Sequence, residues 1–136
     1  MTKIEKRPKL IDWMICDDIR REMNRKLTFV GVYQDIIGVP TLPFTLPQLS
    51  ILTKWDTSKA SIKNFEMKII QPDKNMIGPV IGELESSLED KQRTFIQIGI
   101  TPFQIPVAGK YEIVMKINKR THKVGTFEVA LMSEKS

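Results

Sequence analysis

The chain has 136 residues, a net charge of +5, 41% hydrophobic residues and a single cysteine. This length fits one domain, residues 1–136, with enough apolar side chains for a core. A membrane-spanning helix is excluded because no run of 18 apolar residues exists, and the polar N-terminal sequence MTKIEKRPKL indicates no secretory signal. A lone cysteine cannot form an internal disulfide, so we expect a cytoplasmic protein.

Positive charge is concentrated at the two ends of the chain. Residues 1–30 contain eight Lys or Arg against five Asp or Glu, and residues 109–136 contain six against three. The segment 31–108 is nearly neutral, with seven basic residues against eight acidic ones. Basic ends favour an acidic partner or nucleic acid, although a solvated basic surface explains such a modest excess equally well.

Apolar residues alternate with a period of two along most of the chain, which predicts strands with one buried face. The pattern is clearest in KNFEMKII, where Phe65, Met67 and Ile69 share one face. NKRTH (118–122) joins the last two strands as a short hairpin loop. In chain order, the predicted strands are KLIDWMIC (9–16), LTFVGVY (27–33), PQLSILTKW (47–55), KNFEMKII (63–70), GPVIGELE (78–85), RTFIQIGI (93–100), GKYEIVMKIN (109–118) and KVGTFEVAL (123–131).

Two proline-containing segments interrupt this pattern. VPTLPFTLP (39–47) cannot be a helix or a central strand, so we expect an extended connector or edge segment that crosses between sheets. Pro102 and Pro106 flank FQI in the same way. About eight short strands joined by such crossings are typical of a Greek-key sandwich.

The one helix that the sequence predicts is short and lies near residues 17–25, in DDIRREMNRK. Asp17 or Asp18 would cap it, and Glu22 is spaced as a capping-box partner. A charged strand end followed by a turn is the alternative, because two turns of helix are too few to be stable alone.

Charged residues in two segments are candidate contacts for a partner. Asp17 and Asp18 also raise the question of metal or acid–base chemistry, with Arg20 and Arg21 as an anion clamp. Adjacent carboxylates point to opposite faces of a strand, and no further ligands follow at metal-binding spacing, so local ion pairs such as Asp18 with Arg21 are the simpler interpretation. The candidate contacts are Asp17, Asp18, Arg20, Arg21, Lys119, Arg120 and Lys123.

Neither Cys16 nor His122 indicates catalysis. A cysteine nucleophile needs a base, and the only histidine lies in a predicted hairpin near the other end of the chain. Asp17 would raise the pKa of Cys16, which we expect to be a buried core residue. His122 is predicted to face solvent. We therefore expect no catalytic, cofactor or metal site; an enzyme would need carboxylates from distant segments, such as Asp35, Asp56, Asp73 or Glu83.

Three segments together resemble a family of small uncharacterised bacterial proteins. They are CDDIRREMNRKLTFVGVY, with its Cys-Asp dipeptide and KL-x-x-x-GVY pattern, then VPTLPFTLPQLSI, and finally GKYEIVMKIN with GTFEV. The resemblance implies an immunoglobulin-like β-sandwich and no assigned activity. The late G-x-Y strand is similar to the penultimate strand of such modules, where the tyrosine packs under a connecting loop.

The predicted fold is therefore an all-β, immunoglobulin-like two-sheet sandwich of about seven or eight strands, with residues 1–7 and 132–136 frayed. A jelly roll or a C2-like sandwich is the alternative. The predicted function is a non-enzymatic binding or assembly module acting through loops or a sheet edge. Its partner is another protein or a second copy, with VPTLPFTLP as a pairing edge. The alternative is anion or nucleic-acid binding through the basic ends.

Overall fold

The computed structural model describes residues 7–23, 26–83 and 92–132, which are almost entirely strand and turn. All eight predicted strands are present, and three short strands, β3, β4 and β9, occur in addition. The strands are β1 (Lys9–Arg21), β2 (Leu27–Tyr33), β3 (Ile36–Val39), β4 (Phe44–Leu46), β5 (Leu49–Asp56), β6 (Asn64–Ile70), β7 (Met76–Glu83), β8 (Arg93–Ile100), β9 (Phe103–Ile105), β10 (Gly109–Ile117) and β11 (Arg120–Leu131).

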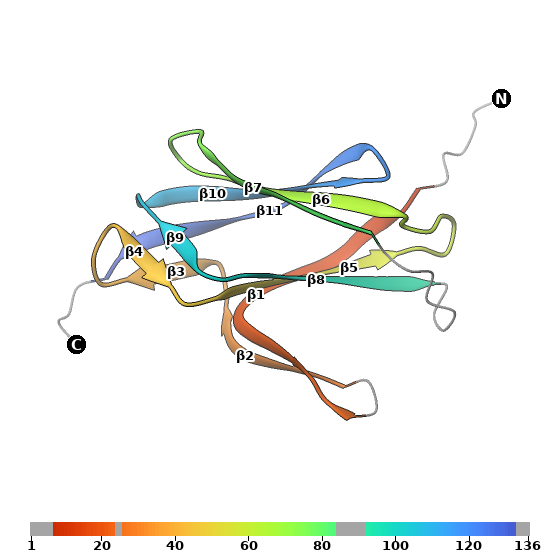
Figure 1. The fold of residues 1–136 in the computed structure, drawn as a ribbon, viewed down its shortest axis with the longest axis horizontal. Helices are drawn as coiled ribbons and strands as arrows, with labels where there is room; N and C mark the ends of the chain where they lie inside the picture. Colours follow the sequence, from red (N-terminus) through yellow and green to blue (C-terminus); the bar gives the residue numbers. More distant parts are fainter. Residues whose placement is uncertain (1–6, 24–25, 84–91, 133–136) are drawn as a thin grey trace.

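Two main sheets face each other, and a two-stranded ribbon lies at one end (Figure 1). The first sheet has the order β2-β1-β5-β8, the second has the order β3-β11-β10-β6-β7, and the ribbon pairs β4 with β9. All pairs are antiparallel except β3 with β11. The fold is thus all-β with several sheets and is not a closed barrel.

The core lies between the inner faces of the two sheets, as the alternation predicts. Phe65, Met67 and Ile69 of β6 are buried, and so are alternate residues of β8 and β10. Strand β5 departs from simple alternation because Leu52, on its outer face, is also buried. Leu131 lies exposed where β11 ends, although Phe127 and Val129 of the same strand are buried.

The first strand does not end in a helix. Residues 17–21 continue β1, so the predicted helix near 17–25 is wrong where the structure describes it; residues 24 and 25 lie outside the described part. The Glu22 N–H donates to the Lys26 carbonyl at 2.8 Å and so closes a β1–β2 hairpin. Residues 15–21 pair with β2, whereas a helix of two turns would be too short to be stable alone.

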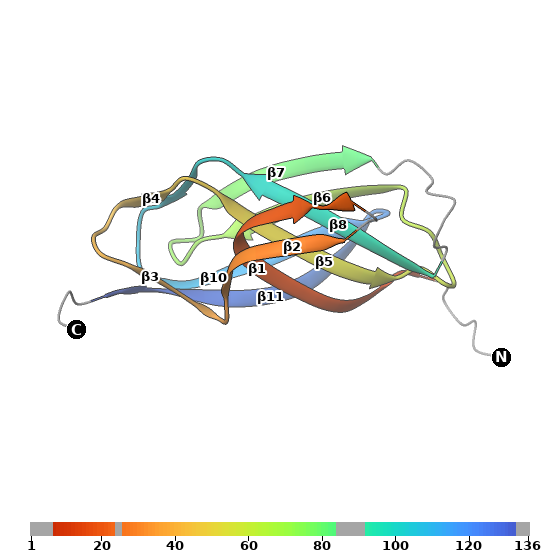
Figure 2. The same ribbon diagram turned by 90° about the horizontal axis from the view of Figure 1, so that it is seen from below.

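The β1–β2 hairpin projects from the sandwich and has its own small apolar cluster (Figure 2 shows both strands on the near side of the molecule). Cys16 and Ile19 of β1 pack with Leu52 of β5, and Leu27 and Phe29 of β2 cover them. This cluster explains why the outer face of β5 is buried.

The proline segments cross between the sheets, as predicted, and VPTLPFTLP contains the end of β3 and all of β4, which are edge strands. Strand β3 joins the second sheet beside β11, and β4 pairs with β9 through Phe44–Ile105 and Leu46–Phe103. Each of these strands has a partner on one side only, so the prediction that this segment offers a pairing edge to a second copy stays a prediction.

The last hairpin is tighter than predicted. Asn118 and Lys119 form a two-residue turn with φ values of 48° and 73°, so β11 begins at Arg120 and not after the whole NKRTH segment. Positive φ at both central residues is the backbone that matches the twist of a two-residue hairpin. At the other end of β10, the buried Tyr111 hydroxyl donates to the Val107 carbonyl at 2.6 Å, so the tyrosine holds the preceding connection as the likeness implied.

Candidate functional surfaces

The first candidate cluster lies at the bend of β1 and is held together by hydrogen bonds. The Tyr33 hydroxyl donates to the Asp17 carboxylate from the neighbouring strand. Gly31, at φ +66°, makes room for that carboxylate, because a Cβ at this position would lie 2.2 Å from Asp17 Oδ2. The Asp17 carboxylate is therefore already hydrogen-bonded within the β1–β2 hairpin.

Asp18 is engaged in the same way on the opposite side of the strand. Its carboxylate accepts a hydrogen bond from Gln48 Nε2 at 3.0 Å and pairs with Arg20 Nε at 3.3 Å. The ion pair joins residues two apart, as a strand requires, and not Asp18 with Arg21 at helical spacing. Arg21 is exposed opposite Leu27 at the end of β1. Exposed pairs of this kind stabilise weakly.

At this bend, neither Cys16 nor Tyr33 has a pKa shifted toward the ionised, reactive form. Burial, and then the Asp17 carboxylate, raise the pKa of the Cys16 thiol, which confirms both expectations for this residue. Burial, and then the hydrogen bond to Asp17, raise the pKa of Tyr33. Both groups are thus neutral at physiological pH, and the hydrogen bonds of the cluster stabilise the β1–β2 hairpin.

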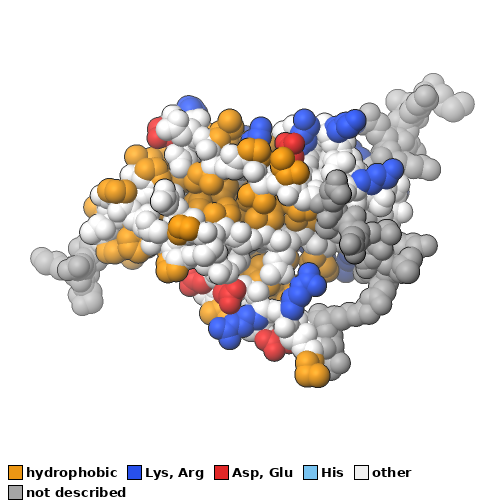
Figure 3. Space-filling view, in the orientation of Figure 1, with side chains coloured by type: hydrophobic (Ala, Val, Ile, Leu, Met, Phe, Trp, Pro, Cys, Tyr) orange, Lys and Arg blue, Asp and Glu red, His pale blue; other side chains and the backbone are white. Residues whose placement is uncertain are grey.

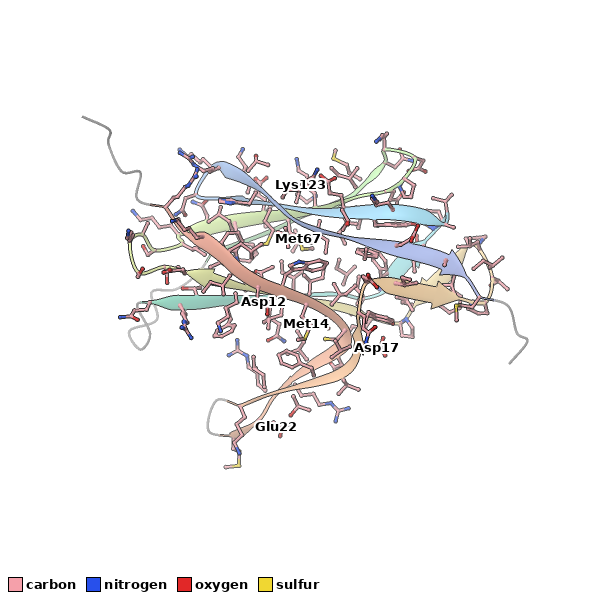
Figure 4. All side chains as sticks on the ribbon, turned by 180° about the vertical axis from the view of Figure 1, so that it is seen from behind. Asp12, Met14, Asp17, Glu22, Met67 and Lys123 are labelled. Carbon is pink, nitrogen blue, oxygen red and sulfur yellow. The ribbon has the colours of Figure 1, made fainter. Side chains whose placement is uncertain are left out.

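The second candidate cluster lies on the β10–β11 hairpin. Lys119 is in the turn, Arg120 begins β11, and Lys123 Nζ lies 3.5 Å from the Glu112 carboxylate on β10. Figure 4 shows Lys123 on the second sheet and Asp17 at the β1 bend, well apart. The structure therefore does not bring the two predicted groups into one site.

His122 is not the solvent-facing residue that the sequence predicted. It is half-buried, and its ring stands edge-on against Trp55, with centroids 5.1 Å apart. Burial, followed by the charges of Arg7 and Arg120, lowers the pKa of His122. The imidazole is thus neutral at pH 7 and forms part of a pocket where the start of β1 meets β11.

A third surface was not identified from the sequence. It is an open pocket of about 550 Å³ beside the β4–β9 ribbon, and no charged side chain of the described residues lines it. Apolar side chains gather between β7 and β8 on this face of the molecule (Figure 3). The only signal in the sequence was the pair of proline-flanked segments. The lining residues are Pro43, Phe44, Thr45, Gln71, Ile77, Ile100, Pro102, Phe103, Gln104, Ile105 and Pro106.

The described residues contain no metal-ligand cluster, since no three His, Cys, Asp or Glu side chains among them gather closely enough. Within the described ranges, no carboxylate belongs to the lining of either pocket. Asp56, one of the carboxylates considered above, accepts hydrogen bonds from the N–H and hydroxyl of Ser58. The side chain of Glu83 lies outside the described part of the structure. In the described ranges, no helix is long and apolar enough to span a bilayer.

A family model described as a family of unknown function, DUF6941, matches residues 11–130. Because the match covers most of the 136 residues, the chain belongs to this family. The predicted resemblance to a family without assigned activity is confirmed to that extent. A comparison with curated proteins found no match.

Proposed function

We propose that this protein is a binding module that recognises an extended, apolar segment of a partner protein. The segment would pair with the edge of β8 and insert an apolar side chain into the pocket beside the β4–β9 ribbon. The observation that carries this proposal is the position of the uncharged pocket, lined by Ile100, at the end of an edge strand.

Strand β8 is the most regular edge in the described residues. It pairs with β5 over eight consecutive residues, Leu49–Ile100 to Asp56–Arg93, without a bulge. It contains no proline, so every residue has a backbone N–H and none is missing from the side that faces away from β5. Such an edge adds an extended peptide through main-chain hydrogen bonds, while pockets for alternate side chains supply specificity.

The other three edge strands of the two main sheets are less suitable. Strand β7 contains Pro79 and a register shift, β3 has four residues, and β2 has Gly31 at positive φ. Prolines and bulges on edge strands are devices that prevent pairing. The contrast with β8 supports a specific binding role for β8 over nonspecific association at every edge strand.

The pocket favours a neutral, apolar side chain. Its walls are proline rings, Phe44 and isoleucines, and it contains two amides, Gln71 and Gln104. Gln71 is 9% exposed, so its amide can reach a ligand only from the pocket that it lines. Burying a ligand charge against this lining would be costly, whereas an apolar side chain would gain about 25 cal/mol per Å² of buried surface.

Selection from a displayed library of seven-residue peptides tests the proposal. Enriched peptides should carry alternating apolar residues and should bind the wild type at least tenfold more tightly than the Gln104→Lys variant, which places a charge in the lining of the pocket. The control is Thr28→Lys, an equally exposed position on β2, which should bind as the wild type does. Peptide binding should shift the amide signals of β8 residues in a ¹⁵N spectrum.

Two results would contradict the proposal. One is a set of selected peptides that bind wild type and Gln104→Lys equally. The other is a salt-resistant dimer in light scattering that Phe95→Lys on β8 dissociates, because a second copy would then occupy the edge. Phe95 is exposed on β8, so this substitution leaves the core intact.

The immunoglobulin-like topology is part of the same proposal. It is supported by the order of the pairs, in which β5 pairs with β8 while β6, β10 and β11 form the opposite sheet. The parallel pairing of β3 with the last strand and the Tyr111–Val107 hydrogen bond at the start of β10 also fit this class. A bacterial host and a cytoplasmic location remain predictions.

A further inference from the structure

The pocket beside the β4–β9 ribbon contains a buried polar side chain, Gln71, which directly follows the end of β6. Figures 1 and 2 both place the turn between β6 and β7 at the same end of the molecule as the ribbon. Gln71 is 9% exposed, whereas Thr45 and Gln104, the other polar side chains in the described lining, are exposed. Gln71 is therefore the most enclosed of these polar groups.

Gln71 differs from the other buried polar side chains in the described part of the chain. The hydroxyls of Ser50, Thr53 and Thr57 each have a hydrogen bond. The side-chain amide of Gln71 has no hydrogen-bond partner among the described residues. Every fully enclosed side-chain nitrogen or oxygen in these residues has a partner, so the Gln71 amide is open to the pocket that it lines. A ligand that fills the pocket displaces solvent from this amide and must replace its hydrogen bond.

The backbone holds Gln71 in a fixed position. Its N–H donates to the Asn75 carbonyl at 2.8 Å, and its own carbonyl accepts from the Lys74 N–H at 2.9 Å. Pro72 restricts the backbone at the next residue, and its ring lies so close to Gly109 that a Cβ there would come within 2.9 Å of it. A tight turn thus presents the amide to the pocket, and such rigidity favours recognition of one chemical group.

The walls of the pocket favour an aromatic ring. Pro43, Pro102, Pro106 and Phe44 contribute flat apolar surfaces, and the volume is about 550 Å³. Aromatic side chains bury the largest apolar area and dominate the energetics of interfaces, so a small aliphatic side chain would gain less here. A charged side chain would be buried without a counter-ion, because no charged side chain of the described residues lines the pocket.

We infer that the pocket takes a tyrosine side chain of the partner's extended segment, with its hydroxyl hydrogen-bonded to the Gln71 amide. This inference rests on the proposed function, which supplies the segment that carries the tyrosine. A phenol hydroxyl both donates and accepts, so it pairs with either the oxygen or the nitrogen of a carboxamide. Phenylalanine would leave the amide unpaired, and a site built to bind a hydroxyl rejects the analogue that lacks it. Glutamine would pair with the amide but has no ring for the apolar walls.

Calorimetric titration of the full chain with synthetic peptides tests this inference. The probe is the tightest seven-residue peptide selected against the wild type, and an alanine scan of this peptide identifies its anchoring residue, which we expect to be tyrosine. Replacing this tyrosine by phenylalanine should weaken binding to the wild type at least tenfold. Replacing it by phosphotyrosine should weaken binding at least a hundredfold, because the described lining offers no cation. Neither comparison requires a variant of the protein.

Two variants then assign the preference to Gln71. Gln71→Met removes the amide and keeps a side chain of similar length, so the tyrosine and phenylalanine peptides should bind this variant within twofold of each other. Gln34→Met makes the same change at an exposed position outside the pocket lining and should keep the tenfold preference. In ¹⁵N spectra, the side-chain NH₂ signals of Gln71 should shift more with the tyrosine peptide than with the phenylalanine peptide. Circular dichroism and thermal unfolding check that both variants fold.

Three outcomes would overturn this inference and leave the proposed function intact. They are equal binding of the tyrosine and phenylalanine peptides to the wild type, a glutamine or asparagine as the anchoring residue, and a tenfold tyrosine preference that persists in Gln71→Met. The last result would show that another group binds the hydroxyl. If no seven-residue peptide bound the wild type, the proposed function would fail, and this inference would fail with it.

Discussion

Gly125 of β11 lies directly against the indole ring of Trp13 on β1. A Cβ at this position would come within 2.3 Å of the ring, whereas a Cβ at Gly99 on β8 would meet nothing within 4 Å. The two glycines therefore serve different purposes: one allows two strands of opposite sheets to approach, and the other is replaceable. Sequence alone does not distinguish them, because both lie within alternating strand patterns.

This difference predicts opposite effects of the same substitution. Gly125→Ala should destabilise the fold by about 1–3 kcal/mol, because the half-buried Trp13 must move. Gly99→Ala should be neutral or stabilising by about 0.5 kcal/mol, since it restricts the unfolded chain at no steric cost. Urea unfolding of both variants measures the effect, and an unchanged midpoint for Gly125→Ala would mean that Trp13 moves without cost.

At the scale of elements, the β10–β11 hairpin combines a turn of positive φ with a clamp, the set of hydrogen bonds from the Asn118 side chain to residues 61–64. The Asn118 side chain accepts a hydrogen bond from the Lys63 N–H at 2.8 Å, and its Nδ2 donates to the Ser61 carbonyl at 2.8 Å. The turn thus holds the connection that leads into β6. Lys119 has the same kind of backbone at φ 73°, yet no hydrogen bond of its side chain stabilises that conformation in the described residues.

Replacing each turn residue by glycine separates backbone strain from the clamp. Lys119→Gly should stabilise the protein by about 1 kcal/mol, because glycine adopts positive φ without a steric penalty. Asn118→Gly should destabilise it by about 1–3 kcal/mol, because the backbone gain is outweighed by the lost hydrogen bonds to residues 61–64. Thermal and urea unfolding measure the change in stability of both variants. A change in the same direction for both would show that the clamp has no net energetic role.

At the scale of the whole molecule, the apolar interior has two parts. The main core fills the space between the sheets, and the small cluster of Cys16, Ile19 and Leu52 fastens the β1–β2 hairpin from outside. Few buried side chains connect this hairpin to the rest. Regions with so few buried apolar contacts open locally at lower free energy than the core.

Hydrogen exchange of the Ile19→Ala variant tests this division. We expect amides of β2 and the end of β1 to lose about 2 kcal/mol of protection, while amides of β6 and β10 change little. Ile113→Val in the main core is the control and should lower protection across both sheets. A uniform loss in Ile19→Ala would instead show that the hairpin unfolds only with the rest of the molecule.

The sequence by itself determined the eight longer strands and the buried face of strands such as β6, because the alternation of apolar residues is a local property that each strand carries in its own residues. It also determined that Cys16 is buried and that its pKa is raised. The tertiary structure decided the rest. Residues 17–21 form a strand and not a helix because they pair with β2. Strand β4 pairs with β9, which lies more than fifty residues further along the chain.

The two pockets likewise arise from distant segments. The pocket beside the β4–β9 ribbon joins the two proline-containing segments, and the second pocket joins Arg7 and Lys9 to Arg120 and His122. The basic excess at both chain ends was visible in the sequence, but the convergence of those charges was not. Which side chains share a pocket depends on strand order and register, and these are set by the packing of the whole chain and not by any one segment.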